Sequence, residues 1–481
     1  YLPLLQITTT TLPEATEGVP YSATIEATGG ATPYTWTVSG LPLGLSWSQV
    51  GDKVEISGTP ASGTAGIYKV DVTVTDSSSP VQSDNVTLQL VVNFGGLIGD
   101  WYVHGTNGDD SNIGTSWSEA FKTIAKALSV ARDGDIILVA DAIYYETNLN
   151  FNGKKIYLKG VDYHPGGLTR PVIDCQQAGR AFKFDSGETE DSVIDNFIIK
   201  NSRGSAISCS NSSGPTIKNC IFINNSAYEG GAIYCSNPNY SPSHRKPTII
   251  NCVFTNNSAD CGGAIAWTFS HLRIINCTFS GNRGSRGGGA IYAENNSDGT
   301  IYNCIFWGNS GGWGSEICWD SGQGCSLHYC CIDSAGVGGY MASNVKKYNC
   351  IYDDPQFVDP ANGDYHLKSI SPCIDAGDNS LVPSTVDKDV DGNQRIANGT
   401  VDIGAYEYQM LITTTTLPDA VEGVAYSYIV RATRNDWANY SWGISGQPSW
   451  LAIDATTGQL SGTPPAGSAG TYTFTVEVTD G

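Results

Sequence analysis

The residues that could do chemistry begin with the stretch DKDVDGN. It places three carboxylates at alternate positions, followed by a glycine and an asparagine: Asp387, Asp389, Asp391, Gly392 and Asn393. Three side-chain oxygens and then a glycine that permits a sharp turn match the first half of a calcium-binding loop, in which Asn393 offers a carbonyl oxygen. The twelfth position of such a loop would hold a bidentate Glu, but here it is Asn398. The pattern therefore predicts either a structural calcium ion or a turn held by hydrogen bonds to the Asp side chains.

All fourteen cysteines lie between Cys175 and Cys373, and no pair has the CxxC…CxxC spacing of a zinc site. Four of them follow an asparagine in a recurring phrase: Cys220, Cys252, Cys277 and Cys304. Side chains alternate between the two faces of a strand, so each of these cysteines lies on the same face as an apolar residue two positions away. We therefore expect these four to point inward as a row of buried thiols. Cys209 and Cys235, each just after an Ala-Ile pair, are the candidate disulfide, since cysteines on adjacent strands come close enough to bond.

The sequence offers no legible active site. Carbohydrate lyases need a basic residue near carboxylates, and hydrolases need clustered carboxylates, but the central repeats contain few charges and the six histidines share no spacing. We therefore expect no enzyme and name no catalytic residue. A polysaccharide-binding or polysaccharide-degrading protein stays open as an alternative, because site residues on different coils would meet only in space. Three tryptophans could stack on sugars or pack at a rim: Trp267, Trp313 and Trp319.

Composition excludes several classes of protein. The net charge is -21, with 26 Lys and Arg against 47 Asp and Glu, which argues against nucleic acid and against anionic membrane surfaces. No run of about twenty apolar residues exists, so we expect no direct membrane insertion.

The chain begins at Tyr1 without a leader segment, so either a signal was removed or the sequence is part of a longer chain. We expect a secreted protein outside the cell or at its surface.

The middle of the chain repeats itself. Segments 216–237, 248–269, 273–295 and 300–321 align, and the Cys of each recurs after 32, 25 and 27 residues. Each unit holds short β-branched strands and Gly or Asn turns without an intervening helix, which predicts a right-handed parallel β-helix of about nine coils over residues 96–352. The asparagines of the phrases NN and GN should stack at turns, where Asn tolerates a left-handed backbone. An amphipathic segment at about 116–132 predicts a helix that caps the N-terminal mouth.

Two parts of this block resemble known families. The phrases FINN, FTNN, FSGN and FWGN, with GGAI at Gly230, Gly262 and Gly288, resemble the repeat of polymorphic outer-membrane proteins, which implies a surface β-helix associated with adhesion. The autotransporter barrel of that family is missing from this sequence. Residues 354–380 and 387–408 resemble the C-terminal segment of choice-of-anchor Q surface proteins. We expect residues 353–408 to close the β-helix.

The two ends of the chain carry nearly the same module. Residues 1–95 and 409–481 share ITTTTLP, SGTP and the ending VTD, and their alternating strands separated by turn residues predict antiparallel β-sandwiches. Both ends resemble immunoglobulin-like, distantly cadherin-like, domains of bacterial and archaeal surface proteins. The predicted fold class is therefore all-β, with a right-handed parallel β-helix flanked by two Ig-like β-sandwiches.

The second module stops after VTD, whereas the first continues through the strand VTLQLVV at 86–92. A sandwich without its last strand exposes an apolar slot and unpaired backbone groups. The apolar extension Tyr1–Gln6 could fill this slot in a neighbouring copy and build a head-to-tail fibre. The expected subunit interface is formed by Tyr1, Leu2, Leu4 and Leu5 against Tyr472, Phe474, Val476 and Val478. A chain whose remainder is absent is the alternative explanation.

We therefore expect an extracellular, non-catalytic structural or adhesive protein. Its expected partners are copies of itself and a surface polysaccharide, and not nucleic acid. The alternatives that the sequence leaves open are the carbohydrate-active β-helix protein and an adhesin fragment that works as a monomer.

Overall fold

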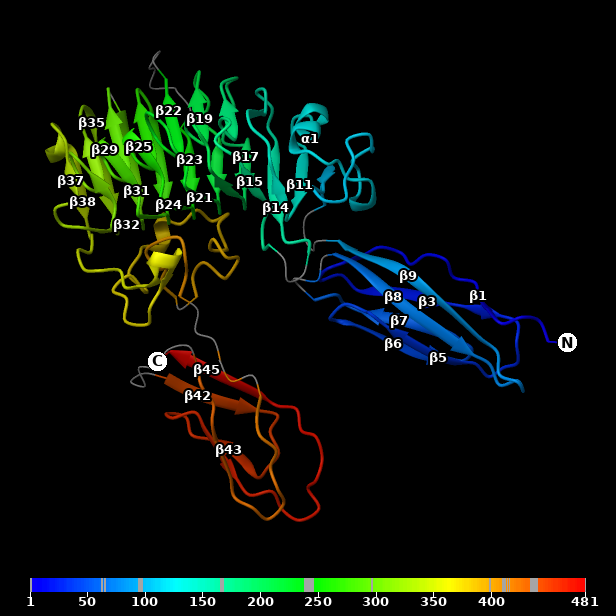
Figure 1. Cartoon of the computed structure of the whole chain (residues 1–481). Coiled ribbons are helices and arrows are strands. Elements are labelled where there is room, and N and C mark those ends of the chain that lie inside the picture. Colours follow the sequence, from blue (N-terminus) through cyan, green and yellow to red (C-terminus); the bar gives the residue numbers. More distant parts are fainter. Residues whose placement is uncertain are drawn as a thin grey trace. The chain divides into compact units, whose positions relative to one another are not determined.

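The structure is a computed structural model that describes residues 2–61, 64, 66–93, 98–164, 168–237, 246–295, 297–397, 399–408, 412, 414, 416–432 and 440–480. Stacked parallel sheets form the middle of the chain, and an antiparallel sandwich forms each end (Figure 1). The predicted all-β class is confirmed. In the described part of the chain, no helix has the length and hydropathy to span a bilayer.

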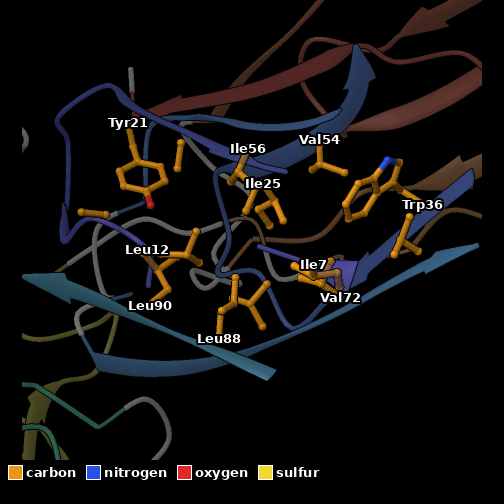
Figure 2. Close-up of a cluster of buried hydrophobic side chains, with 14 of the residues drawn as sticks. Ile7, Leu12, Tyr21, Ile25, Trp36, Val54, Ile56, Val72, Leu88 and Leu90 are labelled. Atoms are coloured by element: carbon orange, nitrogen blue, oxygen red, sulfur yellow. The ribbon is translucent and has the colours of Figure 1, made fainter. Parts of the chain in front are cut away.

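The N-terminal sandwich consists of two sheets and a small edge pair. One sheet has the order β3 (Tyr21–Ile25), β7 (Lys53–Gly58) and β6 (Leu45–Val50). The other has the order β2 (Ala15–Thr16), β9 (Ser83–Asn93), β8 (Gly66–Thr75) and β5 (Thr35–Ser39). Strand β1 (Gln6–Ile7) pairs with β4 (Ala27–Thr28). Alternate side chains point inward and form a dry core that includes Ile25, Trp36, Val54, Val72 and Leu88 (Figure 2).

Three long parallel sheets form the β-helix. The ten-stranded sheet contains β10 (Trp101–Val103), β11 (Ile136–Ala140), β14 (Tyr157–Val161), β17 (Val193–Asp195), β20 (Thr216–Lys218), β23 (Thr248–Ile250), β27 (His271–Ile275), β31 (Ser297–Tyr302), β35 (Gly322–His328) and β38 (Val345–Tyr348). The first eight-stranded sheet contains β12 (Ile143–Tyr144), β15 (Val172–Asp174), β18 (Ile198–Lys200), β21 (Ile221–Ile223), β24 (Val253–Thr255), β28 (Thr278–Ser280), β32 (Ile305–Trp307) and β36 (Cys331–Ile332). The second contains β13 (Leu149–Asn150), β16 (Phe182–Phe184), β19 (Ile207–Ser210), β22 (Ile233–Ser236), β26 (Ile265–Thr268), β30 (Ile291–Glu294), β34 (Ile317–Trp319) and β37 (Val337–Gly338). A short extra sheet joins β25 (Ser258–Cys261), β29 (Arg283–Gly287) and β33 (Ser310–Gly311).

The repeated phrase FxxN explains how successive coils keep their register. Its phenylalanine points inward, and the rings of Phe254, Phe279 and Phe306 stack with centroids 4.6 and 4.7 Å apart. The residue before its asparagine has a left-handed backbone, with φ of 54° at Asn256 and 70° at Gly281. This turn directs the next asparagine into the interior, which confirms the predicted stacking at turns. The four expected inward thiols are also buried: Cys220, Cys252, Cys277 and Cys304.

The inward asparagines form a hydrogen-bonded ladder. The backbone N–H and the side-chain amide of Asn257 donate to the side-chain oxygen of Asn282, at 3.1 and 2.9 Å. Asn282 donates in the same way to Asn309, at 2.9 and 2.8 Å, and Asn309 in turn donates to the buried carboxylate of Glu316. Each rung ties one coil to the next inside a core where an unpaired polar group would be costly.

The N-terminal cap is shorter than predicted. Helix α1 covers only Ile124–Val130, and residues 117–119 form a separate 3₁₀ turn, η1 (Trp117–Glu119). The cause is local, because the backbone N–H of Phe121 donates to the Tyr102 carbonyl at 2.9 Å and the Phe121 carbonyl accepts from the N–H of His104 at 2.8 Å. The helix then begins after Thr123, whose side chain accepts from the backbone N–H of Lys126.

The closing segment lies along the side of the coils. It contains β39 (Phe357–Asp359), β40 (Asp364–Leu367), η3 (Pro360–Asn362) and η4 (Asn379–Leu381), and η2 (Ala342–Asn344) precedes it. The side chains of Asn251 and Asn303 donate to the carbonyls of Lys388 and Asp378, at 2.6 and 3.2 Å. Since these asparagines belong to different coils, the segment binds several coils together.

The C-terminal sandwich repeats part of the N-terminal plan. One sheet has the order β41 (Tyr426–Ile429), β44 (Gln459–Gly462) and β43 (Leu451–Ile453), and the other pairs β42 (Tyr440–Ser445) with β45 (Thr475–Asp480). The bridge Ile412–Ala432 corresponds to the bridge Ile7–Ala27 of the first sandwich.

Replacing Asn282 by Ala tests the ladder. The change removes the rungs on both sides and leaves polar groups of Asn257 and Asn309 unpaired, so the free energy of unfolding should fall by roughly 2–4 kcal/mol. Urea unfolding, followed by far-UV circular dichroism, measures the loss. The matched control is Asn107→Ala, because the Asn107 side chain is exposed. Equal losses in the two variants would contradict a stabilising ladder.

Candidate functional site

The two sandwiches differ at one strand edge. In the first, β8 pairs with β5 on one side and with β9 on the other. Its counterpart in the second, β45, pairs with β42, and no other described residue lies in register beside it. Strand β8 spans Gly66–Thr75, but residues 470–474, the counterparts of its first half, have no strand conformation. An edge without a neighbour leaves backbone N–H and C=O groups unpaired.

The open edge changes the burial of equivalent side chains. In the first sandwich Val70 and Val72 are 0% and 1% exposed, whereas their counterparts Phe474 and Val476 are only half-buried. Leu12 is 9% exposed, whereas its counterpart Leu417 is 39% exposed. Val478 is also half-buried, and Tyr472 is 44% exposed. The residues that the sequence predicts as an acceptor surface are therefore incompletely covered.

A groove of about 660 Å³ lies beside this edge. Its walls include Leu417, Tyr426, Trp450, Tyr472 and Phe474. In the first sandwich the equivalent space is filled by β9, whose Leu90 is opposite Tyr68 and whose Val92 is opposite Ala15.

One backbone hydrogen bond at the rim is the same in both sandwiches. The N–H of Gly18 donates to the carbonyl of Pro60, and the N–H of Gly423 donates to that of Pro464, each at 2.9 Å. The groove therefore resembles the site that β9 occupies in the first sandwich, but no described strand occupies it.

The predicted donor segment, residues 1–6, packs in part against its own N-terminal sandwich. Leu5 is 2% exposed within the N-terminal core, and its backbone N–H donates to the Gln82 side chain at 3.0 Å. The carbonyl of Pro3 accepts from the N–H of Gly30 at 2.8 Å. Leu2 and Leu4 are exposed, and Tyr1 lies outside the described residues. Leu5 therefore packs in the adjacent core of its own chain in this structure, and the subunit interface through residues 1–6 stays a prediction.

The Asp side chains of the loop 387–393 point in different directions. The Asp389 carboxylate is buried and accepts from the backbone N–H groups of Asp391, Asn393 and Glu407, at 3.0, 2.8 and 3.0 Å. Asp391 instead contacts His366. Asp387 contributes its backbone carbonyl, which accepts from the N–H of Arg395 at 2.9 Å.

This geometry favours the hydrogen-bonded turn. Among the described residues, no three His, Cys, Asp or Glu side chains gather closely enough to hold a metal ion. The calcium ion stays a prediction.

A buried ionic cluster behind this turn was not predicted. Arg395 is 0% exposed, and its Nη2 lies 3.1 Å from a Glu407 carboxylate oxygen and donates to the Asp402 carbonyl at 2.8 Å. Burial raises the pKa of Glu407 to about 8 and that of Asp402 to about 6. Both carboxylates also accept backbone N–H groups. Since these groups are buried, the cluster holds the closing segment together and cannot reach a polymer substrate.

The cysteine and tryptophan predictions have separate outcomes. Cys209 and Cys235 are register partners on β19 and β22, and both are free thiols here, so their disulfide stays a prediction.

Trp267 and Trp319 are buried against each other and cannot stack on a sugar. Trp313 is 53% exposed, as a sugar-stacking residue requires.

Two protein-family models match the chain. The family described as "Putative Ig domain" matches residues 3–93 and 409–481, and the family described as "Right handed beta helix region" matches residues 174–279 and 240–369. These matches agree with a right-handed β-helix flanked by Ig-like domains. The resemblances to choice-of-anchor Q proteins and to polymorphic outer-membrane repeats stay predictions. None of the curated proteins compared with the chain is similar to it.

Several solved structures share limited likeness with the chain. An endo-fucoidan hydrolase from glycoside hydrolase family 107 is 17% identical over 30% of this chain, with a TM-score of 0.17, and the match spans 18% of the hydrolase. Pectate lyase Pel9A is 14% identical, with a TM-score of 0.33 and coverage of 64% of this chain and 96% of the lyase. A rhamnogalacturonan lyase is 12% identical, with a TM-score of 0.27 and coverage of 54% and 90%.

The pKa of His366 gives a pH test of the turn. A hydrogen bond to Asp391, aided by one to Asp364, raises this pKa from 6.5 to about 9. Because the folded-state pKa is raised, the stabilisation is complete below about pH 6.5 and is lost as the pH rises through about 9. NMR titration of the imidazole should show this value, and Asp391→Asn should lower it. The control Asp353→Asn, on an exposed residue, should leave it unchanged. An unperturbed pKa near 6.5 in the parent chain would contradict the assigned contacts.

Proposed function

We propose that this chain is an extracellular, non-catalytic structural protein whose C-terminal sandwich takes up an added β-strand at the open edge of β45. One observation supports this proposal: residues 470–474, which precede β45 and line the groove in part, are the counterparts of residues 66–70, beside which β9 lies in the first sandwich. Addition of a strand would pair the open edge and cover the half-buried row formed by Phe474, Val476 and Val478.

The first sandwich indicates what the added strand should look like. Strand β9 runs antiparallel to β8 and places Leu88 opposite Val70 and Leu90 opposite Tyr68. Both leucines are nearly or fully buried, and burying one such side chain contributes roughly 1.5–3 kcal/mol. The partner strand should therefore carry large apolar residues at alternate positions, opposite Phe474 and Tyr472.

The proposal does not include a fibre built through residues 1–6. Leu5 would have to leave its own core, where it is 2% exposed, before it could enter a neighbouring chain. The extracellular location is inferred from the net charge of -21 together with the β-helix and Ig-like architecture. The non-catalytic role is inferred because the central repeats contain few charges and the cluster of ionisable groups around Arg395 is buried.

A peptide with the sequence of β9, residues 83–93, tests strand addition. The intact chain should bind this peptide, and the tyrosine and tryptophan fluorescence of the groove should change on binding, because Trp450 and Tyr472 line it. A peptide with Leu88→Asp and Leu90→Asp should not bind, because each change places a charge against the apolar groove.

Variants of the chain separate the groove from the rest of the surface. Tyr472→Ala should weaken peptide binding and leave the fold intact, because this side chain is 44% exposed. The matched control is Val81→Ala on the first sandwich, at a residue that is 64% exposed. The proposal fails if the β9 peptide does not bind, or if both variants bind it as tightly as the parent chain.

A further inference from the structure

A second concave site lies on the β-helix. It has a volume of about 530 Å³, and β29, β30, β34 and the turn after β33 contribute to its walls. Two glycines keep it open. A Cβ at Gly287 would lie 3.0 Å from the Cys318 sulfur, and a Cβ at Gly312 would lie 2.6 Å from the Arg286 carbonyl. This volume falls in the range of small-molecule sites.

One wall of this site is aromatic. The indole of Trp313 is 53% exposed and lines the groove. Tyr340 contacts the indole in an edge-to-face arrangement, with ring centroids 5.0 Å apart. The exposed indole, held by a second ring, offers a flat apolar face. Because exposure of this face to water is unfavourable, a ligand that covers it would be stabilised.

The facing wall is polar. The hydroxyl of Tyr292 lies 2.9 Å from a Glu294 carboxylate oxygen and 3.3 Å from Oδ2 of Asp320. The other oxygen of Asp320, Oδ1, is buried and has no hydrogen-bond partner among the described residues. Asp320 also lines the groove, so its carboxylate can accept a hydrogen bond from a bound hydroxyl group.

The charges around the groove select among ligands. Asp320 lines it, and Glu294 and Asp260 contact its lining residues Tyr292 and Ser285. Among the described residues, Arg286 is the one basic residue that lines it. An excess of carboxylates repels anionic ligands and accepts hydrogen bonds from neutral hydroxyls.

The Cys318 thiol of the groove does not add nucleophilic chemistry. Cys318 is buried, and burial raises its pKa to about 12. It therefore stays protonated at neutral pH, and only a thiolate would attack a ligand. The groove has the parts of a binding site.

We propose that this groove binds a neutral pyranose unit of a glycan. The apolar face of the sugar lies on Trp313, one sugar hydroxyl donates to the Asp320 carboxylate, and Arg286 donates to a ring or hydroxyl oxygen. A uronate polymer is disfavoured because its carboxylates would face those of the protein. The site is independent of the strand groove in the C-terminal sandwich.

A panel of soluble glycans tests the proposal with the intact chain. Affinity electrophoresis is run with a neutral β-glucan, a mannan and a galactan, and with polygalacturonate as the anionic comparison. At least one neutral glycan should retard the chain, and polygalacturonate should not. Trp313→Ala should weaken the retardation by roughly ten-fold, because it removes the aromatic platform. Asp320→Asn should also weaken the retardation, because the substitution replaces one acceptor oxygen of the carboxylate by an NH2 group, which can only donate.

The matched control is Tyr145→Ala, which removes an aromatic side chain that is 63% exposed elsewhere on the β-helix. It should bind as the parent chain does, and circular dichroism should show all variants folded. The proposal is overturned if none of the neutral glycans binds, if polygalacturonate binds more tightly, or if Trp313→Ala binds unchanged. New reducing ends in the bound glycan would also overturn it, because the groove would then be a catalytic site.

Discussion

Backbone pairing at strand edges is the constraint on which this molecule depends. Each β-strand carries backbone N–H and C=O groups on both edges. Groups left unpaired destabilise the folded chain or form hydrogen bonds with another strand. The β-helix meets this demand by stacking each coil on the next, as in the ten-stranded sheet from β10 to β38. The first sandwich meets it with β9. The second sandwich has the open edge of β45, and its groove is the physical consequence.

Side chains inside the coils make this stacking specific. A parallel sheet alone would tolerate a slip in register, which would turn inward residues outward. The ladder of Asn257, Asn282 and Asn309 prevents such a slip, because each amide must meet the amide of the next coil. The stacked rings of Phe254 and Phe279 add an apolar constraint at the same corner. The outer surface is then free to vary, and one part of it forms the Trp313 groove.

Repetition made the fold predictable from the sequence. The recurring phrase around Cys252 and Phe254 indicated both the coil length and the inward face, and the two matching ends indicated the sandwiches. The sequence could not distinguish Leu5 as a donor from Leu5 as part of its own core, because an apolar side chain suits both. It also offered Trp267, Trp313 and Trp319 as equals, and only packing separated the buried pair from the exposed ring. The Arg395–Glu407 pair was missed because its members lie in different turns.

Amide hydrogen exchange of the intact chain tests the open edge most directly. The account predicts that residues 71–75 exchange slowly throughout, because β5 and β9 pair with both edges of β8 there, and that residues 66–70 are protected at the alternate positions that pair with β9. Residues 470–474 should exchange rapidly, and residues 475–480 should show protection at alternate positions, where β42 pairs with β45. Equal protection of the two segments in the chain alone would contradict the account, because the edge of β45 would then already be covered.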